Sequence, residues 1–136
     1  MRQISLNMLN YAVGVEASNP VAVTKEEFWN IYLELLAVKN NVHLAERTKG
    51  FFVEILCGEI GKNYFSGDNR EAIAKKLDLH NTQFTHFSKE LTGCGYMEKL
   101  GRGIVMPKES FMKMQKMLET EDVIINFLFP IVVNNE

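Results

Sequence analysis

The sequence predicts a mainly α-helical fold with one small β-hairpin, and three observations support this prediction. Apolar residues recur at helical spacing in five separate segments. Two of these segments are short and are separated only by a turn at residues 78–81. The stretch GCGYMEKLGRGIVMP, residues 93–107, then combines four glycines with a short β-branched run, which is typical of a hairpin. The predicted order is therefore two helices, a helix-turn-helix pair of two further short helices, a hairpin and a last helix.

The first predicted helix spans residues 24–39. Thr24 and Glu27 have the spacing of a capping box, in which each side chain satisfies a backbone amide that the first helical turn leaves unpaired. An apolar stripe at helical spacing follows and predicts the buried face of this helix. The stripe consists of Phe28, Ile31, Leu35 and Val38, widened by Tyr32 and Leu36.

A second helix is predicted over residues 43–58, where Gly58 and Gly61 end the apolar pattern. Gly50 lies inside this pattern, although glycine in a helix interior costs about 1 kcal/mol relative to alanine. The expected core positions are Leu44, Phe51, Phe52, Ile55 and Leu56.

Two short helices follow. Asp68 and Glu71 repeat the spacing of a capping box, and Ile73, Ala74 and Leu77 form a short apolar face. In the next helix, which begins after Asn81, we expect one face to be buried and the opposite face to point outward. The buried face holds Phe84, Phe87, Ser88 and Leu91, and the outward face holds Gln83, Thr85, His86 and Lys89.

The hairpin is predicted from Tyr96 to Pro107, with the turn at residues 101–103. Its first strand contains Met97 and Leu100, and its return strand is the run of residues 104–106. A last amphipathic helix, about residues 108–118, is expected to bury Phe111, Met114 and Leu118.

The chain is predicted to have three parts. The elements above form the domain proper at residues 21–118, an arm or short strand precedes it at 1–20, and an acidic and apolar tail follows at 119–136. The tail is apolar at ten of the eleven positions 123–133. Three interpretations stay open for it. It pairs as a strand with residues 1–15, it exchanges onto a neighbouring copy, or it packs across helix 24–39.

Composition and charge restrict the class of protein. Hydrophobic residues make up 46% and charged residues 24% of the chain, as in ordinary globular domains, and the net charge of −2 does not indicate a polyanionic partner. Lys and Arg outnumber Asp and Glu only in residues 66–118, by nine to six. The start of the chain lacks the pattern of a secretory signal, and no apolar run is long enough to span a bilayer. We therefore expect a cytoplasmic protein without a membrane partner.

Candidate catalytic and metal-binding groups are sparse. Cys57 and Cys94 are too few for a disulfide scaffold, and Cys57 is expected to be a small buried hydrophobic residue. The separations of His80, His86 and Cys94 do not place three donors on one face, so we predict no metal site and no cofactor. Asp68, Glu71 and Glu90 are interpreted as a cap and solvated charges. With neither a nucleophile motif nor a phosphate-cradling loop, we expect no enzymatic activity.

The segment NREAIAKKLDLHNTQFTHFSKELTGCGYMEKLGRGIVMP resembles the bacterial and phage winged helix-turn-helix family. The resemblance depends on a small residue, Ala74, in the second helix, on Leu77 and Leu79, and on a Gly-Tyr step that leads into a Gly-Arg-Gly wing. It covers about 40 residues closely, and about 75 if helix 43–58 is the first helix of the motif. The implied fold is a winged helix with an added N-terminal helix and a C-terminal helix and tail.

This resemblance implies that the protein binds double-stranded DNA, with the helix after Asn81 in the major groove and the hairpin on the flanking backbone. Gln83 would pair with an adenine edge, while Lys89, Lys99 and Arg102 would contact phosphates. The complete set carried over from the family is Asn81, Thr82, Gln83, Thr85, His86, Lys89, Lys99 and Arg102.

Two functional classes are therefore kept. The first is a DNA-binding transcriptional regulator, or a replication or packaging accessory factor, in the cytoplasm of a bacterial or phage-infected cell. One protomer offers about four phosphate contacts, so we expect a homodimer or larger assembly, formed through the C-terminal helix and tail. The second is a winged-helix interaction or structural subunit that binds protein instead of DNA. The single cation of the recognition helix, Lys89, and the acidic tail favour this alternative.

Overall fold

The structure is a computed structural model, and it describes residues 2–7, 22–120 and 123–128 of the 136. The chain divides into two compact units. One unit is Val23–Lys116, and the other contains the strands β1 (Arg2–Asn7) and β4 (Val123–Leu128).

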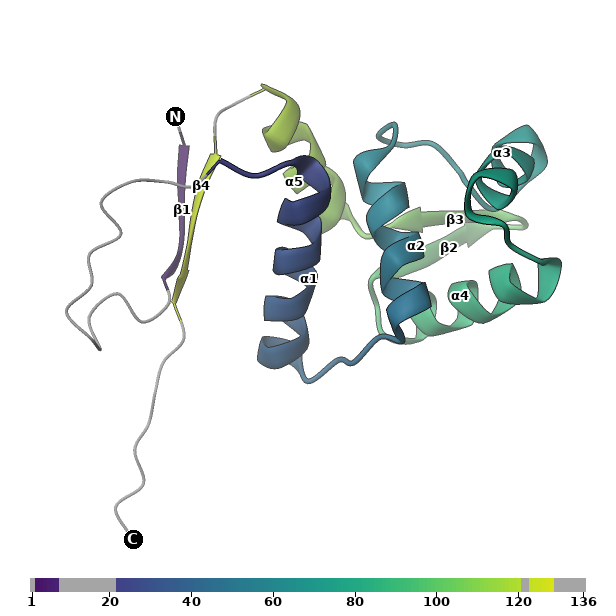
Figure 1. The fold of residues 1–136 in the computed structure, drawn as a ribbon, viewed down its shortest axis with the longest axis horizontal. Coiled ribbons are helices and arrows are strands. Elements are labelled where there is room, and N and C mark those ends of the chain that lie inside the picture. The colour runs from purple at the N-terminus through teal and green to yellow at the C-terminus, as the bar shows by residue number, and fades with distance from the viewer. Residues whose placement is uncertain (1, 8–21, 121–122, 129–136) are drawn as a thin grey trace, which may run out of the picture. The chain divides into compact units, whose positions relative to one another are not determined.

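The unit Val23–Lys116 has the predicted fold class: it is mainly helical and carries one antiparallel hairpin, a layout like that of a winged helix-turn-helix with an added helix at each end (Figure 1). The last helix, α5, begins in this unit, and its final turn from Met117 belongs to the other. The elements are α1 (Lys25–Asn40), α2 (Glu46–Cys57), α3 (Gly67–Leu77), α4 (Asn81–Gly93), β2 (Met97–Gly101), β3 (Ile104–Pro107) and α5 (Glu109–Thr120).

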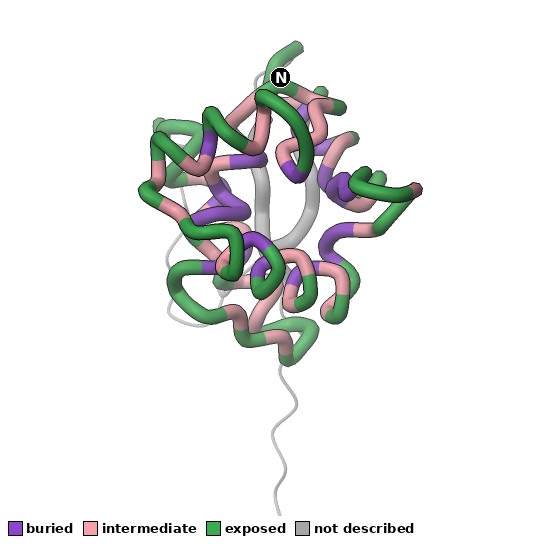
Figure 2. The backbone as a smooth tube through the Cα atoms, turned by 90° about the vertical axis from the view of Figure 1, so that its right-hand side faces the viewer, coloured by how far each residue is buried: buried purple, intermediate pink, exposed green. Residues whose placement is uncertain are grey.

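The core forms around α2, which lies between α1 and α5 on one side and α3 and α4 on the other (Figure 1). Its neighbouring residues Phe51 and Phe52 are both buried and point into two aromatic clusters. The ring of Phe51 stacks on Phe87 of α4 at 4.7 Å, and Phe52 meets Phe111 of α5 edge-on at 5.1 Å. The buried positions, purple in Figure 2, accordingly face the middle of the unit. Helix α2 thus fixes the position of α4, the helix predicted to contact DNA.

The capping box of α1 is confirmed, whereas its predicted buried face is only partly correct, since Phe28, Tyr32, Leu35 and Leu36 are half-buried. The backbone N–H of Glu27 donates to Thr24 Oγ1 at 3.1 Å, and the N–H of Thr24 donates to Glu27 Oε1 at 3.4 Å. The residues that α1 buries are Trp29 and Leu33. Apolar residues occupy most positions of α1, so periodicity alone does not select a face, and contact of Trp29 with Phe111 of α5 selects this one. Two members of the predicted stripe, Ile31 and Val38, are 47% and 71% exposed.

The start of α3 also differs from the prediction. Ser66, and not Asp68, is the residue that precedes the first turn, and no side chain caps it. The hydroxyl of Ser66 instead accepts a bond from the Asn63 side chain at 2.8 Å. Asp68 therefore lies inside the first turn, where its negative charge favours the positive end of the helix.

The turn between α4 and the hairpin follows the predicted role of its glycines. Helix α4 ends at Gly93, and Gly95 has a φ of +85°, which places it in the left-handed region. The N–H of Tyr96 donates to Leu91 C=O at 3.0 Å and the N–H of Gly95 to Thr92 C=O at 3.2 Å, which is a Schellman motif. The chain is thereby turned directly into β2.

The hairpin pairs Met97 with Pro107 and Lys99 with Val105, and its register shifts by one residue between Lys99 and Gly101. Its turn is at Arg102 and Gly103. The last helix, α5, buries Phe111 and Met114 as predicted, but Gln115 is buried in place of Leu118. Gln115 Nε2 donates to the C=O of Leu56 at 3.0 Å and so satisfies a carbonyl in the last turn of α2.

In the second unit, β1 and β4 form a parallel pair with Arg2 opposite Val123 and Ile4 opposite Ile125. The structure therefore agrees with the first interpretation of the tail, in which it pairs as a strand with the N-terminal segment, for residues 123–128. The other predicted parts of the arm and tail, residues 8–20 and 129–136, lie outside the described residues.

Candidate nucleic-acid interface

The outward face of α4 is formed by the residues that the resemblance assigns to DNA contact. Phe84, Phe87 and Leu91 are buried, as their spacing predicts. The exposed side chains are Asn81, Thr82, Thr85, His86 and Lys89, whereas Gln83 is half-buried. One face of the helix is thus held by the core, and the other is left for a partner.

Four of these polar side chains already contact groups of the protein itself, namely Asn81, Gln83, Thr85 and His86. Gln83 Oε1 accepts a bond from the backbone N–H of His80 at 2.7 Å, which satisfies an amide at the start of α4. Asn81 Oδ1 accepts a bond from the Arg70 guanidinium at 3.3 Å. A bidentate contact with adenine uses both polar atoms of an amide, so Gln83 would use the second lone pair of an oxygen that already accepts from His80.

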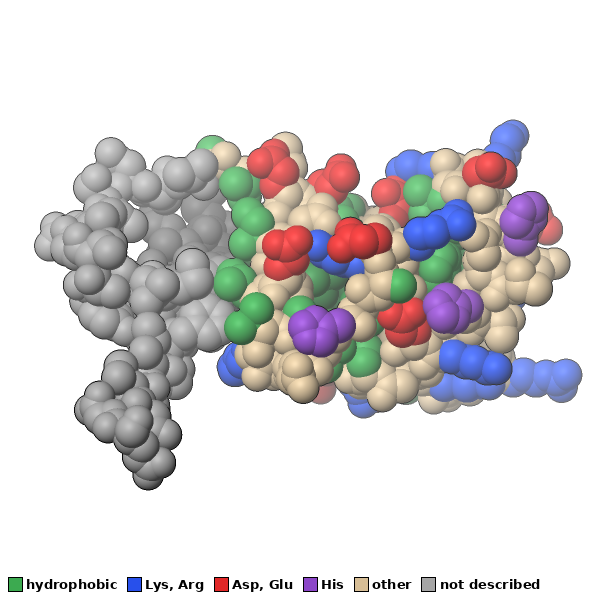
Figure 3. Space-filling model, turned by 60° about the horizontal axis from the view of Figure 1, so that its bottom comes forward, with side chains coloured by type: hydrophobic (Ala, Val, Ile, Leu, Met, Phe, Trp, Pro, Cys, Tyr) green, Lys and Arg blue, Asp and Glu red, His purple; other side chains and the backbone are tan. Residues whose placement is uncertain are grey.

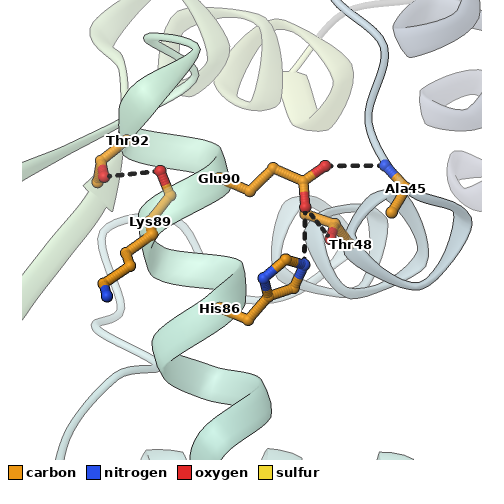
Figure 4. Close-up of polar contacts among 6 residues, drawn as sticks. All are labelled: Ala45, Thr48, His86, Lys89, Glu90 and Thr92. Carbon is orange, nitrogen blue, oxygen red and sulfur yellow. Dashed lines mark hydrogen bonds and ion pairs between the residues drawn. The ribbon is translucent and has the colours of Figure 1, made fainter.

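His86 lies next to a carboxylate that joins two helices (Figure 4). Glu90 accepts the backbone N–H of Ala45 at 2.8 Å and the hydroxyl of Thr48 at 2.7 Å, while His86 Nε2 lies 3.2 Å from Glu90 Oε2. The interpretation of Glu90 as a solvated charge is therefore wrong. It satisfies the backbone N–H of Ala45, the residue before α2, as the acidic member of a capping box does, and it pairs the buried hydroxyl of Thr48.

Lys89 points away from this network, on the other side of α4 (Figure 4). It lines an open groove of about 280 Å³ between α4 and the hairpin. Lys99 of β2 and Arg70 of α3 line the same groove, and the guanidinium of Arg70 lies 4.6 Å from the centre of the Phe84 ring. Three cations from three elements therefore converge on one surface. The other lining residues are Phe65, Phe84, Thr85, Ser88, Gly103 and Val105.

Arg102 extends this surface at the tip of the hairpin. It is exposed and precedes Gly103, which has a φ of +72°. Two apolar side chains flank it in the hairpin, Leu100 and Ile104, which are 60% and 43% exposed. The wing thus presents one cation between two apolar groups.

Within the part of the chain that the structure describes, the cations of the groove and of the hairpin tip lack acidic partners, whereas most other lysines of the unit have one. Glu98 of the hairpin pairs with Lys108 at 3.0 Å and Glu34 with Lys49 at 2.8 Å, and Glu54 pairs with Lys76. Among the described residues, Lys89, Lys99 and Arg102 have no carboxylate within ion-pair distance. In Figure 3 the blue side chains are prominent at the end formed by α3, α4 and the hairpin. These unpaired cations suit contact with a polyanion.

Sequence reasoning missed Arg70 as a member of this surface. Lys75, another cation of α3, is exposed and does not line the groove. The position of Arg70 depends on the Phe84 ring and on Asn81, both in the next helix. No local motif marks such a contact.

The groups required for other chemistry are not assembled in the part of the chain that the structure describes. No three His, Cys, Asp or Glu residues lie close enough there to hold a metal ion. Cys57 is half-buried, less than expected, and burial raises the pKa of both Cys57 and Cys94, which favours the neutral and unreactive thiol. Within the same residues, no helix is long and apolar enough to cross a membrane.

Comparisons with family models, curated proteins and solved structures give no match for the chain. The function must therefore be inferred from the groove, the hairpin and the outward face of α4.

Proposed function

We propose that the protein binds double-stranded DNA through α4 and the hairpin, without chemistry, as a transcriptional regulator or a replication or packaging accessory factor. The observation that supports this most directly is the groove in which Arg70, Lys89 and Lys99 converge without acidic partners among the described residues. Polar side chains on α4 would face the bases, and the groove and Arg102 would face the phosphates.

The exposed polar side chains of α4 suit contact with bases, and the cations of the groove suit contact with phosphates. Thr82, Thr85 and His86 are exposed along the front of α4 and offer short polar groups to base edges. Arg70 is held in place by Phe84 and Asn81, so little side-chain entropy would be lost when it meets a phosphate. The net charge of the chain is −2, so attraction to DNA has to be local.

Four cations per protomer is a small number for a DNA-binding protein, and we extend the proposal to a homodimer or larger assembly formed through the C-terminal helix and tail. Two copies would double the phosphate contacts and place two recognition helices on one duplex. The parallel pairing of β4 with β1 supports this extension, since a sheet of only two strands is marginal by itself.

The test compares two double variants that remove equal charge. Lys89→Ala with Lys99→Ala removes two groove cations, and Lys25→Ala with Lys39→Ala removes two exposed lysines of α1. We expect the groove variant to lose at least about tenfold in affinity for a random duplex, and the control to lose little. Equal losses in both variants would show that binding follows net charge and would contradict the proposed surface. Both should unfold at the wild-type temperature.

The second candidate, a module that binds protein, is favoured by the exposed Leu100 and Ile104 of the hairpin. Under this alternative, Leu100→Ser with Ile104→Ser would abolish partner binding, and the wild-type protein would not retain DNA even at low salt. Under the first proposal, the same double variant keeps most of its DNA affinity because both cations of the hairpin remain.

A further inference from the structure

Asn63, in the connection between α2 and α3, makes more side-chain hydrogen bonds than any other described asparagine. Its Nδ2 donates to the C=O of Gly103 at 2.7 Å and to Ser66 Oγ at 2.8 Å. Its Oδ1 accepts the backbone N–H groups of Phe65 at 3.2 Å and Val105 at 3.3 Å. Oδ1 faces two backbone N–H donors and Nδ2 faces a backbone carbonyl. These partners fix which end of the amide is oxygen and which is nitrogen.

The two bonds to the hairpin have the pattern of a sheet. Gly103 C=O and Val105 N–H lie on either side of Ile104, and a residue in a neighbouring parallel strand would bond to the same two groups. In the described part of the chain, β3 has β2 as its only strand partner. The amide of Asn63 therefore occupies the outer edge of β3, where a third strand would otherwise pair.

These bonds are placed where they fix the cations of the wing. Gly103 is adjacent to Arg102 at the tip, and Val105 is the register partner of Lys99. The backbone C=O of Asn63 accepts a bond from Asn69 Nδ2 of α3 at 3.0 Å, so the same residue is tied to the helix-turn-helix. A two-stranded hairpin has little stability of its own, and a tie of this kind would limit its movement relative to α4.

We propose that Asn63 is a positioning residue for DNA binding: its side-chain amide replaces a third strand and holds Lys99 and Arg102 in register with α4. This inference rests on the proposed function. It assigns to Asn63 no contact with DNA, only an effect through the hairpin.

The test on DNA is a double-mutant cycle with Asn63→Ala and the pair Lys99→Ala, Arg102→Ala. Asn63→Ala should weaken the affinity for a random duplex and lower the salt slope by up to about 1.8, the value for two phosphate contacts. In the background without Lys99 and Arg102 it should have no further effect, because the groups that it positions are gone. Equal fold losses in both backgrounds would overturn the proposal. Asn30→Ala is the matched control, since Asn30 bonds to Glu26 C=O within α1.

Amide hydrogen exchange tests the tie without DNA and so separates the two proposals. In Asn63→Ala the N–H of Val105 should exchange roughly two- to tenfold faster, the factor for one hydrogen bond, while amides of α2 keep their wild-type rates. If the wild-type protein does not bind DNA but Val105 responds in this way, the proposed function fails and the tie stands. Unchanged exchange of Val105 in Asn63→Ala would refute the tie itself.

Discussion

Glu90 illustrates how a single side chain on α4 connects the candidate interface to the core. It accepts bonds from Ala45 N–H and Thr48 Oγ1 at the start of α2, and His86 on the outward face lies 3.2 Å from it. Charge-assisted bonds of this kind are stronger than neutral ones, and removal of the acceptor leaves donors unpaired. Glu90 therefore serves stability first, and it holds α4 against α2 at the same time.

Replacement of Glu90 by alanine should lower the free energy of unfolding by about 2 kcal/mol, because Thr48 is buried and would lose its partner. Glu71→Ala is the control, since Glu71 is an exposed carboxylate of α3, and it should change the stability by less than about 0.5 kcal/mol. Chemical denaturation of both variants measures the difference. Equal stability of the two variants would contradict the role assigned to Glu90.

At the scale of the element, two glycines, one inside α2 and one just after α4, have opposite conformational requirements. An added Cβ meets nothing within 4 Å at either Gly50 of α2 or Gly95 after α4, so space does not distinguish them. Gly95 has a φ of +85° and Gly50 does not lie in the left-handed region. The backbone conformation alone should decide the outcome of a substitution.

We expect Gly50→Ala to raise the free energy of unfolding by about 1 kcal/mol, since alanine is the better helix former. Gly95→Ala should lower it by about 1 kcal/mol or more, because a left-handed conformation is strained for any residue with a Cβ. Thermal unfolding of the pair measures both effects. A shift of the same sign in both variants would mean that backbone conformation does not control these positions.

The elements that sequence reasoning predicted are those with a local signal. The capping box of α1, the buried face of α4 and the glycine turns of the hairpin all depend on residues within a few positions of one another. The errors lie where a distant partner decides. Trp29 of α1 packs against Phe111 of α5, and Glu90 is bonded by residues more than forty positions away.

The same limit applies to the candidate site. Lys89, Lys99 and Arg102 were predicted because the resemblance assigns their positions, and the structure brings Lys89 and Lys99 to one groove. Arg70 and Asn63 were missed because their roles consist of contacts with other elements. A cation–π contact and a side chain that imitates a strand leave no periodic pattern in the sequence.

At the scale of the whole molecule, the proposed assembly depends on the unit that contains β1 and β4. Each strand has the other as its partner, in parallel register. Deletion of residues 123–128 removes the partner of β1, and we expect the protein to lose self-association and, with it, most of its DNA affinity. Sedimentation velocity of the full chain and of the deletion variant measures this. An unchanged sedimentation profile would contradict the proposed role of the tail.

The most direct test of the central claim is the salt dependence of the affinity of the full chain for a duplex of random sequence. Under the proposal, Arg70, Lys89, Lys99 and Arg102 would contact four phosphates per protomer, so the slope of log affinity against log salt should be about −3 to −4 per protomer between about 20 and 200 mM salt. Fluorescence anisotropy of a labelled duplex measures it. Absence of binding at the lowest salt, or an affinity that does not fall as salt rises, would contradict the claim that α4 and the hairpin bind DNA.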